Sequence, residues 1–339
     1  MRKRKTASVL VVLLLLPAVA LSVLPLLASA VGRVAETAAE ATKTDLRGVY
    51  SVNGRLHISF FGTPDGAPIT TGPGDMKPSW AKTGGKIVFF RLITPAPRIP
   101  GWKTAICVVN TDGTGFRKLT DGSQTDFNPT WSRDGKNAIL FSRRDPNRET
   151  YAVYMTTAEA NPGDEVAVSD PQCSSFANSS LKDGRIFVAG TSPTGGRGYF
   201  LLTPSKEGKP VYEKVNFAYP LEGTLDRVSI APSETKVTCE FQKGFGPYSY
   251  PGRTLYIADF DVRTRTVSNP VAITDAQPDP KVTTLYPRWT KDESAVVYHC
   301  DKSGKSQLYM YRLEDKSTIL VSTNKDASYA FPCGEQTPK

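Results

Sequence analysis

The sequence predicts an all-β fold, a six-bladed β-propeller whose blades are four-stranded antiparallel sheets. Three observations lead to this fold: a motif that recurs about every fifty residues, the same order of four strand-like segments in each repeat, and two incomplete repeats that complement each other. Four antiparallel strands per repeat of this length make up a propeller blade. Apolar residues recur with no sustained helical period through the expected ring.

The recurring motif is a short strand, a polar turn and a second strand of β-branched and aromatic residues, which favour a pleated, half-buried surface. Its aligned positions are Trp80, Trp131, Ser180, Ile230 and Trp289. They are separated by 51, 49, 50 and 59 residues, and a partial sixth copy begins 44 residues after the last. Turns such as Asp134-Gly135 reverse the chain because Gly accepts positive φ and Asp bonds the local backbone. Tryptophans that recur in register indicate packing between blades.

The two incomplete repeats are expected to form one blade together. Residues 46–52, 55–61 and 68–71 match second, third and fourth strands, with Asn53-Gly54 as a hairpin turn. Residues 328–333 match a first strand alone. We therefore expect the C-terminal strand to pair with residues 46–52. This pairing closes the ring and removes the sheet edges that an open ring would expose.

The first thirty residues read as a secretory signal peptide. Arg2 to Lys5 are basic, residues 9–27 are almost wholly apolar, and Ala28-Ser29-Ala30 is a small-residue cleavage pattern. An uncleaved membrane anchor is the alternative, since the apolar stretch is long enough to span a bilayer. The expected organisation is a signal peptide over 1–30, a linker over 31–45 and the propeller over 46–339. We expect an exported protein of the periplasm, the cell surface or the extracellular space, with membrane contact only through an uncleaved signal.

The charge and cysteine content limit the classes of partner and site. Residues 1–30 hold four of the 42 Lys and Arg and none of the 33 Asp and Glu, so the remainder has a net charge of +5, which is spread along the chain. Such a distribution does not indicate nucleic-acid binding. The five cysteines (Cys107, Cys173, Cys239, Cys300 and Cys333) show no CxxC spacing, and an odd count leaves at least one without a partner in the chain. Their pairing stays open, as does the alternative of buried thiols. We expect a monomer.

One repeat carries a family resemblance. Residues 110–120 run Asn-Thr-Asp-Gly-Thr-Gly-Phe-Arg-Lys-Leu-Thr, and Pro129-Thr130-Trp131-Ser132-Arg133-Asp134-Gly135-Lys136 follows. This segment resembles the TolB-type (WD40-like) propeller repeat, Asp-Gly, then Leu-Thr, then Pro-x-Trp-Ser-Pro-Asp-Gly-Lys. The resemblance implies an extracytoplasmic propeller that binds other proteins. It does not extend to the α/β domain that precedes the propeller in TolB, so it does not imply the role of TolB itself.

The sequence offers little catalytic chemistry. It contains no G-x-S-x-G nucleophile elbow. Its two histidines, His57 and His299, do not suffice for the metal site of oligogalacturonate-lyase-like propellers, although carboxylates could complete one. We therefore expect a binding protein rather than an enzyme, with no catalytic residue, metal or cofactor. The alternative is a carbohydrate-active propeller that cleaves or binds acidic glycans, to which Arg91 and Arg143 would bind.

The expected binding surface is the propeller face on which the loops after the second strands converge. The longest of these loops, residues 92–103 and 244–253, are rich in Pro, Gly and aromatic residues. Stiff loops with aromatic side chains suit recognition of a protein or peptide because they lose little entropy on binding. The predicted surface residues are Arg91, Trp102, Arg143, Arg144, Tyr248, Tyr250 and His299.

Overall fold

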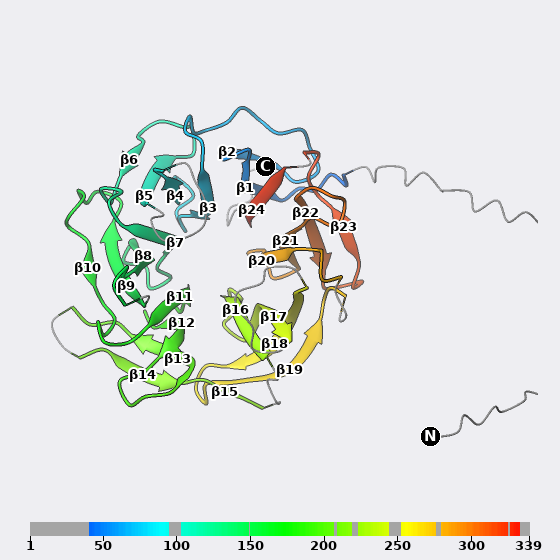
Figure 1. Ribbon diagram of the computed structural model, residues 1–339. Helices are drawn as coiled ribbons and strands as arrows, with labels where there is room; N and C mark the ends of the chain where they lie inside the picture. The colour runs from blue at the N-terminus through cyan, green and yellow to red at the C-terminus, as the bar shows by residue number, and fades with distance from the viewer. Residues whose placement is uncertain are drawn as a thin grey trace, which may run out of the picture. The chain divides into compact units, whose positions relative to one another are not determined.

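In the computed structural model, the chain forms a ring of six sheets around a central axis (Figure 1), and we call the space around this axis, beside the innermost strands, the channel. The structure describes residues 41–94, 103–148, 150–206, 209–218, 223–243, 252–275, 279–324 and 326–332. Residues 40–339 form one compact unit. We name the sheets blades A to F in ring order, beginning with the blade that contains both chain ends. The predicted six-bladed all-β propeller is confirmed.

In blades B to F the strands follow the chain from the innermost strand outward, except that β15 precedes β16 in the chain and lies at the outer edge of blade E. Blade B contains β3 (Asp75–Trp80), β4 (Lys86–Leu92), β5 (Thr104–Asn110) and β6 (Arg117–Lys118). Blade C contains β7 (Thr125–Trp131), β8 (Ala138–Arg144), β9 (Tyr151–Thr157) and β10 (Val166–Ala167). Blade D contains β11 (Ser175–Ser180), β12 (Ile186–Thr191), β13 (Arg197–Thr203) and β14 (Val211–Lys214). Blade E contains β16 (Gly223–Ile230), β17 (Lys236–Lys243), β18 (Thr254–Asp261), β19 (Thr266–Ala272) and β15 (Asn216–Phe217). Blade F contains β20 (Thr284–Trp289), β21 (Ala295–Cys300), β22 (Gln307–Arg312) and β23 (Thr318–Leu320). The aligned positions of the repeat are thus the last residues of the innermost strands.

Blade A joins the two ends of the ring, as the sequence predicts. It contains β24 (Ala327–Pro332), β1 (Arg47–Val52) and β2 (Arg55–Phe60), and Figure 1 shows the red C-terminal strand beside the blue N-terminal one. The strands β24 and β1 are antiparallel, with Ser328 opposite Ser51 and Phe331 opposite Val49. Asn53 and Gly54 both have positive φ (50° and 72°), which a two-residue type I′ hairpin requires. A single bridge between His57 and Pro68 stands in place of a fourth strand.

A hydroxyl side chain completes the outer edge of five blades. In each of these blades, a Thr or Ser hydroxyl accepts a hydrogen bond of 2.9–3.0 Å from a backbone N–H of the third strand (β2 in blade A). This Thr or Ser follows the apolar residue at the end of the repeat. The pairs are Leu56 with Thr70, Ile106 with Thr120, Val153 with Ser169, Leu255 with Thr274 and Leu308 with Ser322. Each side-chain oxygen thus satisfies a backbone donor of the third strand at the outer part of its blade.

Hydrophobic packing lies between the blades. The buried residues form six clusters, and each cluster combines side chains of two neighbouring blades. The predicted packing role of the tryptophans holds: the indole N–H of Trp131 donates to the Ser79 carbonyl at 3.0 Å, and that of Trp289 to the Ser229 carbonyl at 3.1 Å, each across a blade boundary. Trp80 donates instead to Gly84 in its own turn, at 2.7 Å. Non-directional burial between all six sheets therefore holds the ring closed.

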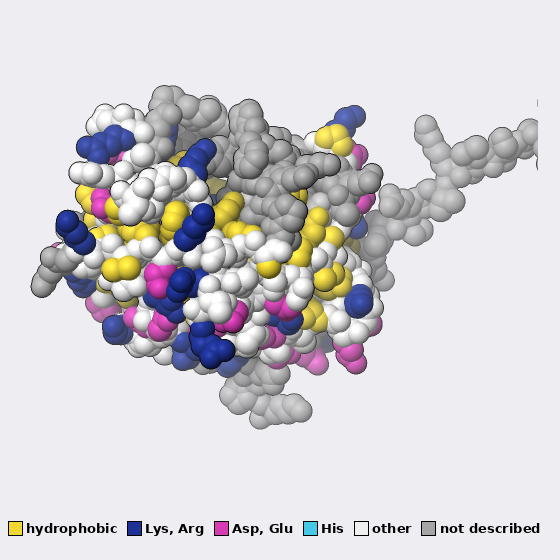
Figure 2. Space-filling model, turned by 90° about the horizontal axis from the view of Figure 1, so that it is seen from below, with side chains coloured by type: hydrophobic (Ala, Val, Ile, Leu, Met, Phe, Trp, Pro, Cys, Tyr) yellow, Lys and Arg dark blue, Asp and Glu magenta, His cyan; other side chains and the backbone are white. Residues whose placement is uncertain are grey.

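The outside of the ring shows no single-sign patch among the described residues on the side drawn in Figure 2. Lys and Arg side chains lie among Asp and Glu side chains there, with apolar groups between them. Within the same described ranges, no helix is long and apolar enough to cross a membrane. The apolar segment 9–27 of the expected signal peptide lies outside these residues, as does most of the linker.

Blade E departs from the predicted four strands, because β15 adds a parallel fifth strand beside β19.

Candidate functional site in the central channel

Each innermost strand has a β-bulge near its middle, where the register with the second strand shifts. The six bulge residues are Lys77, Asn128, Asn178, Arg227, Tyr286 and Tyr329, and we call them the channel ring. All but Asn178 have a left-handed backbone, with φ between 46° and 57°. A non-glycine residue in this region carries strain, and a bulge re-aims the side chain that it bears. One strained residue in each of five blades is therefore directed at the channel.

The backbone N–H groups released by the bulges are bonded by neighbouring blades. The Tyr286 N–H donates to Glu240 Oε1 at 2.7 Å, from blade F to blade E. The Tyr329 N–H donates to His299 Nδ1 at 3.3 Å, and the Val228 N–H to Asn178 Oδ1 at 3.1 Å. The bulges of blades A, E and F are thus bonded by a side chain of the preceding blade, so the conformation of this part of the channel ring depends on contact between blades.

Side chains of the channel ring meet across blade boundaries. Lys77 Nζ donates to Asn128 Oδ1 at 2.5 Å and lies 4.5 Å from the centre of the Tyr286 ring. The guanidinium of Arg227 lies 4.3 Å from the centre of the same ring, and the Tyr286 and Tyr329 rings meet edge to face at 4.7 Å. Residues from blades A, B, C, E and F therefore form one contiguous polar and aromatic layer across the channel.

A buried ion cluster supports this layer on one side. Glu240 of β17 has no exposed surface, and its Oε2 accepts from Arg227 at 2.5 Å and from Arg253 at 2.9 Å. Its other oxygen accepts the Tyr286 N–H, so a single carboxylate holds two arginines and the neighbouring blade. Buried charges persist only when they are paired and bonded in this way.

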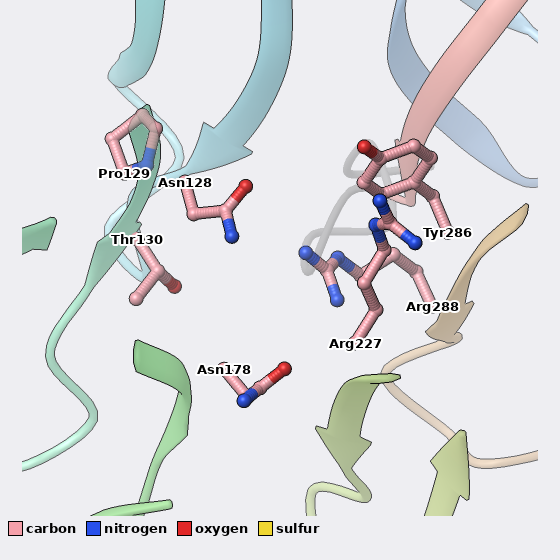
Figure 3. Close-up of a pocket in the computed structure, with 7 residues that line it drawn as sticks. All are labelled: Asn128, Pro129, Thr130, Asn178, Arg227, Tyr286 and Arg288. Carbon is pink, nitrogen blue, oxygen red and sulfur yellow. The ribbon is translucent and has the colours of Figure 1, made fainter. Parts of the chain in front are cut away.

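A pocket opens within the channel, and Figure 3 shows how its walls face each other. Asn128, Pro129, Thr130 and Asn178 of blades C and D lie opposite Arg227, Tyr286 and Arg288 of blades E and F. The cavity volume is about 10 Å³, which is room for roughly one water molecule. Amide and guanidinium groups point into it from both sides. The pocket can therefore hold a small, hydrogen-bonding group.

The end of the channel that carries the turns between first and second strands, which we call the turn side, is bridged by side chains. The guanidinium of Arg133, in a turn of blade C, donates to the carbonyls of Ile230, Ala231 and Pro232 in blade E at 3.0–3.3 Å. The Lys182 N–H donates to Glu234 at 2.6 Å, which joins the turns of blades D and E. These bonds cross the turn side; we call the opposite end, where the second strands end, the loop side.

Two of the predicted surface residues, Arg91 and Arg143, lie at the loop-side ends of β4 and β8 in buried ion pairs. Arg91 binds Asp75 through two bonds of 2.6 and 2.8 Å, and Arg143 binds Asp126 through two bonds of 2.6 and 2.9 Å. Both arginine side chains are 16% exposed, and both aspartates are fully buried. Burial favours a lower pKa for Arg143, but its bonds to Asp126 and to Glu165 raise the pKa above the ordinary value.

The other predicted surface residues lie in three settings. His299 is buried in β21 between Tyr286 and Tyr329, each 5.2 Å away between ring centres, and so belongs to the channel. Arg144 is the last residue of β8 and is partly buried. Trp102, Tyr248 and Tyr250 lie outside the described residues. Of the predicted residues that the structure describes, His299 thus contacts the channel ring.

We expect His299 to make stability depend on pH. Burial, with the nearby charges of Arg227 and Lys77, lowers its pKa to about 3. Between pH 6.5 and pH 3 the His299 side chain binds a proton in the unfolded chain but not in the folded protein. The contribution of His299 to the free energy of unfolding is therefore complete above about pH 6.5 and decreases as the pH falls, by roughly 2 kcal/mol at pH 5. Urea unfolding at both pH values should show a smaller loss for His299→Gln, whereas His57→Gln should keep the full loss. An equal loss in both variants would contradict this role.

The described residues contain no group of three or more His, Cys, Asp or Glu side chains that could hold a metal ion. Cys107, Cys173, Cys239 and Cys300 are buried free thiols, and Cys333 lies outside the described residues. Burial raises the pKa of Cys107 and of Cys239 to about 12, so both thiols stay protonated. The described cysteines therefore contribute packing in this structure.

The channel ring was not predicted, although the repeat contains its signal. Lys77, Asn128, Arg227 and Tyr286 each stand three positions before an aligned position, at the point where the innermost strand bulges. Three of the four precede a proline. Where the innermost strands of the repeats are otherwise alike, a position whose residue type differs from repeat to repeat indicates a side chain directed at the channel.

Comparison with known proteins identifies the fold. No family model matches the sequence, and no curated protein matches it either. TolB from Acinetobacter baumannii is similar in structure, with a TM-score of 0.59 and 13% identity over 85% of this chain and 66% of that one. A putative TolB from Agrobacterium tumefaciens has a TM-score of 0.52 and 10% identity, covering 85% of this chain and 97% of that one. A chain of a nidogen–laminin complex has a TM-score of 0.55 and 6% identity, covering 85% of this chain and 98% of that one.

The chain spans just under two thirds of the Acinetobacter protein, and identities this low establish the fold alone. The resemblance seen in residues 110–136 and the structural similarity over 85% of the chain agree with each other. The chain therefore has the fold of a TolB-like six-bladed β-propeller.

Proposed function

We propose that this chain is an exported β-propeller that binds a protein or peptide at the loop side of its channel. The observation that carries the proposal is the channel ring, in which five non-glycine residues are held at positive φ with their side chains on a common channel. Such strain persists only where the surrounding structure enforces it, and it is concentrated at ligand sites. Tyr and Arg, which make up half of the ring, are the residue types that dominate protein-binding sites.

Three further observations support the proposal. The basic and apolar residues at the N-terminus, with Ala28-Ser29-Ala30, favour export. One of the similar structures is a chain in a complex of two proteins, nidogen and laminin. The loops 92–103 and 244–253 follow second strands, so they start at the loop side. Trp102, Tyr248 and Tyr250 are therefore proposed to contact the partner around the mouth, with Arg91, Arg143 and Arg144 at the strand ends behind them.

A carbohydrate-active propeller is the second candidate, because the guanidinium and amide groups of the pocket also suit the carboxylate of a uronic acid. Incubation with polyuronides and a divalent metal ion separates the two. Appearance of unsaturated product would overturn the binding function in favour of a lyase.

A peptide-display selection against the purified protein tests the binding function directly. We expect selected peptides to lose at least about tenfold in affinity when Tyr329 or Asn128 is replaced by alanine, because each removes a contact in a desolvated centre. Lys136→Ala, whose side chain is 81% exposed on a turn, serves as the matched control and should bind normally. Peptides that bind all three variants as well as the unchanged protein would place the site elsewhere and contradict the proposal.

A further inference from the structure

We propose that the pocket of the channel binds one carboxylate group, the tip of an acidic side chain of a bound peptide, with Arg288 as its main partner. This inference rests on the proposed peptide-binding function and specifies its chemistry. It follows from three properties of the pocket: its inward amide and guanidinium groups are donors, Arg288 pairs with no carboxylate among the described residues, and its volume is small.

The amides of the pocket have their oxygens occupied. Asn128 Oδ1 accepts from Lys77 Nζ, which can only donate. Asn178 Oδ1 accepts the Val228 N–H, while its nitrogen donates to the Phe176 carbonyl at 3.2 Å and keeps a second N–H. These partners fix the orientation of both amides. The Asn128 and Asn178 side chains therefore offer N–H groups to a ligand.

The opposite wall is cationic. Arg288 lies in β20, partly buried, and its hydrogen bond goes to the Pro287 carbonyl at 3.5 Å. No carboxylate of the described residues lies within 4.0 Å of its guanidinium, and Glu240 is already bound to Arg227 and Arg253. Burial lowers the pKa of Arg288 to about 10, while Tyr286 and the charge of Glu240 act in the opposite direction and the charge of Arg227 acts in the same direction as burial. An anion is the ligand that balances this charge.

The size of the pocket limits how much of an anion can enter it. A guanidinium with amide donors opposite it matches a planar carboxylate or a phosphate. A cavity of about 10 Å³ has room for about one oxygen atom, so a carboxylate enters with one oxygen while the rest of the ligand stays outside the cavity. The turn side is bridged by Arg133, so the remainder of the ligand extends toward the loop side.

Titration of the full-length protein with acetyl-glutamate amide tests the inference, with acetyl-glutamine amide as the neutral isostere. The Nε–H signals of the arginines, followed by NMR, report binding. We expect a saturable shift of the Arg288 signal by the acidic probe and at least about tenfold weaker binding of the neutral one, as for a lost charge-assisted hydrogen bond. Inorganic phosphate and galacturonate are titrated in parallel. Stronger binding of phosphate or of galacturonate would overturn the assignment.

The variant Arg288→Met separates ligand binding from a structural role. If Arg288 is kept for a ligand, its removal should abolish the preference for the acidic probe and raise the melting temperature, by roughly 2–4 °C, because an uncompensated charge leaves the channel. Arg148→Met, whose side chain is 61% exposed, is the matched control and should preserve both properties. A lower melting temperature for Arg288→Met would assign Arg288 to the framework and overturn the inference.

Failure of this inference is distinguishable from failure of the peptide-binding function. If display-selected peptides bind and depend on Tyr329 and Asn128, but neither they nor the acidic probe depends on Arg288, the carboxylate site is wrong and the proposed function stands. If no peptide binds through the channel ring and the acidic probe also fails, both are wrong.

Discussion

Replacement of Glu240 by alanine is expected to lower the free energy of unfolding by about 3–5 kcal/mol, the effect of removing one partner from a buried ion pair. The side chain has no exposed surface and binds Arg227, Arg253 and the Tyr286 N–H. Its loss removes the Glu240 carboxylate from two buried guanidinium groups and from one backbone N–H. Urea unfolding followed by circular dichroism measures the change.

Two further variants show which part of Glu240 matters. Glu240→Gln keeps an oxygen for the Tyr286 N–H but removes the charge, so its effect should lie between those of the unchanged protein and the alanine variant. Glu159→Ala removes a carboxylate that is 71% exposed and 3.5 Å from Lys86, and it should change stability by less than about 0.5 kcal/mol. A Glu240→Ala protein as stable as Glu159→Ala would show that the cluster is not needed for the ring.

The strand order was predictable because the signals for strands and turns are local and occur in every repeat. The aligned positions from Trp80 to Trp289 are indeed the ends of the innermost strands. Ring closure was predictable for a different reason: residues 46–52 and 328–333 are each incomplete as a blade, and only their pairing satisfies both edges. The parallel strand β15 has no counterpart in other repeats, so nothing in the repeat pattern indicates it.

The ion pairs at the loop side illustrate what the sequence reveals only in part. The sequence identifies Arg91 and Arg143 as cationic residues at the ends of second strands, and it predicts that they bind a ligand or a partner protein. Asp75 and Asp126 each stand five residues before a tryptophan of the motif, and each binds the arginine of its own blade. The repeat thus contained both halves of the pair, but their contact follows from the register of the innermost and second strands, which a bulge shifts.

The channel ring was harder to predict because its residues share a backbone conformation and not a chemical type. Lys77, Arg227 and Tyr286 look unrelated in the sequence, and contact between blades B and F across blade A follows only from the closed ring. Neither the donor-rich pocket nor the position of Arg288 could be seen before the six bulges were placed on one channel. Sequence repeats therefore predict the frame of a propeller, while its site depends on the positions where the repeats differ.

Truncation after Asn324, which removes β24, is expected to destabilise the ring by at least about 5 kcal/mol, comparable to the whole stability of an ordinary domain. The truncation deletes the strand that pairs with β1, takes Ala327 and Ala330 out of the cluster between blades A and F, and leaves the edge of β1 unpaired. We expect aggregation or loss of a cooperative urea transition, measured by size-exclusion chromatography and circular dichroism. Truncation after Pro332 keeps β24 whole, so the difference between the two proteins isolates the contribution of this strand. If both truncated proteins unfold at the same urea concentration, closure by β24 does not stabilise the ring.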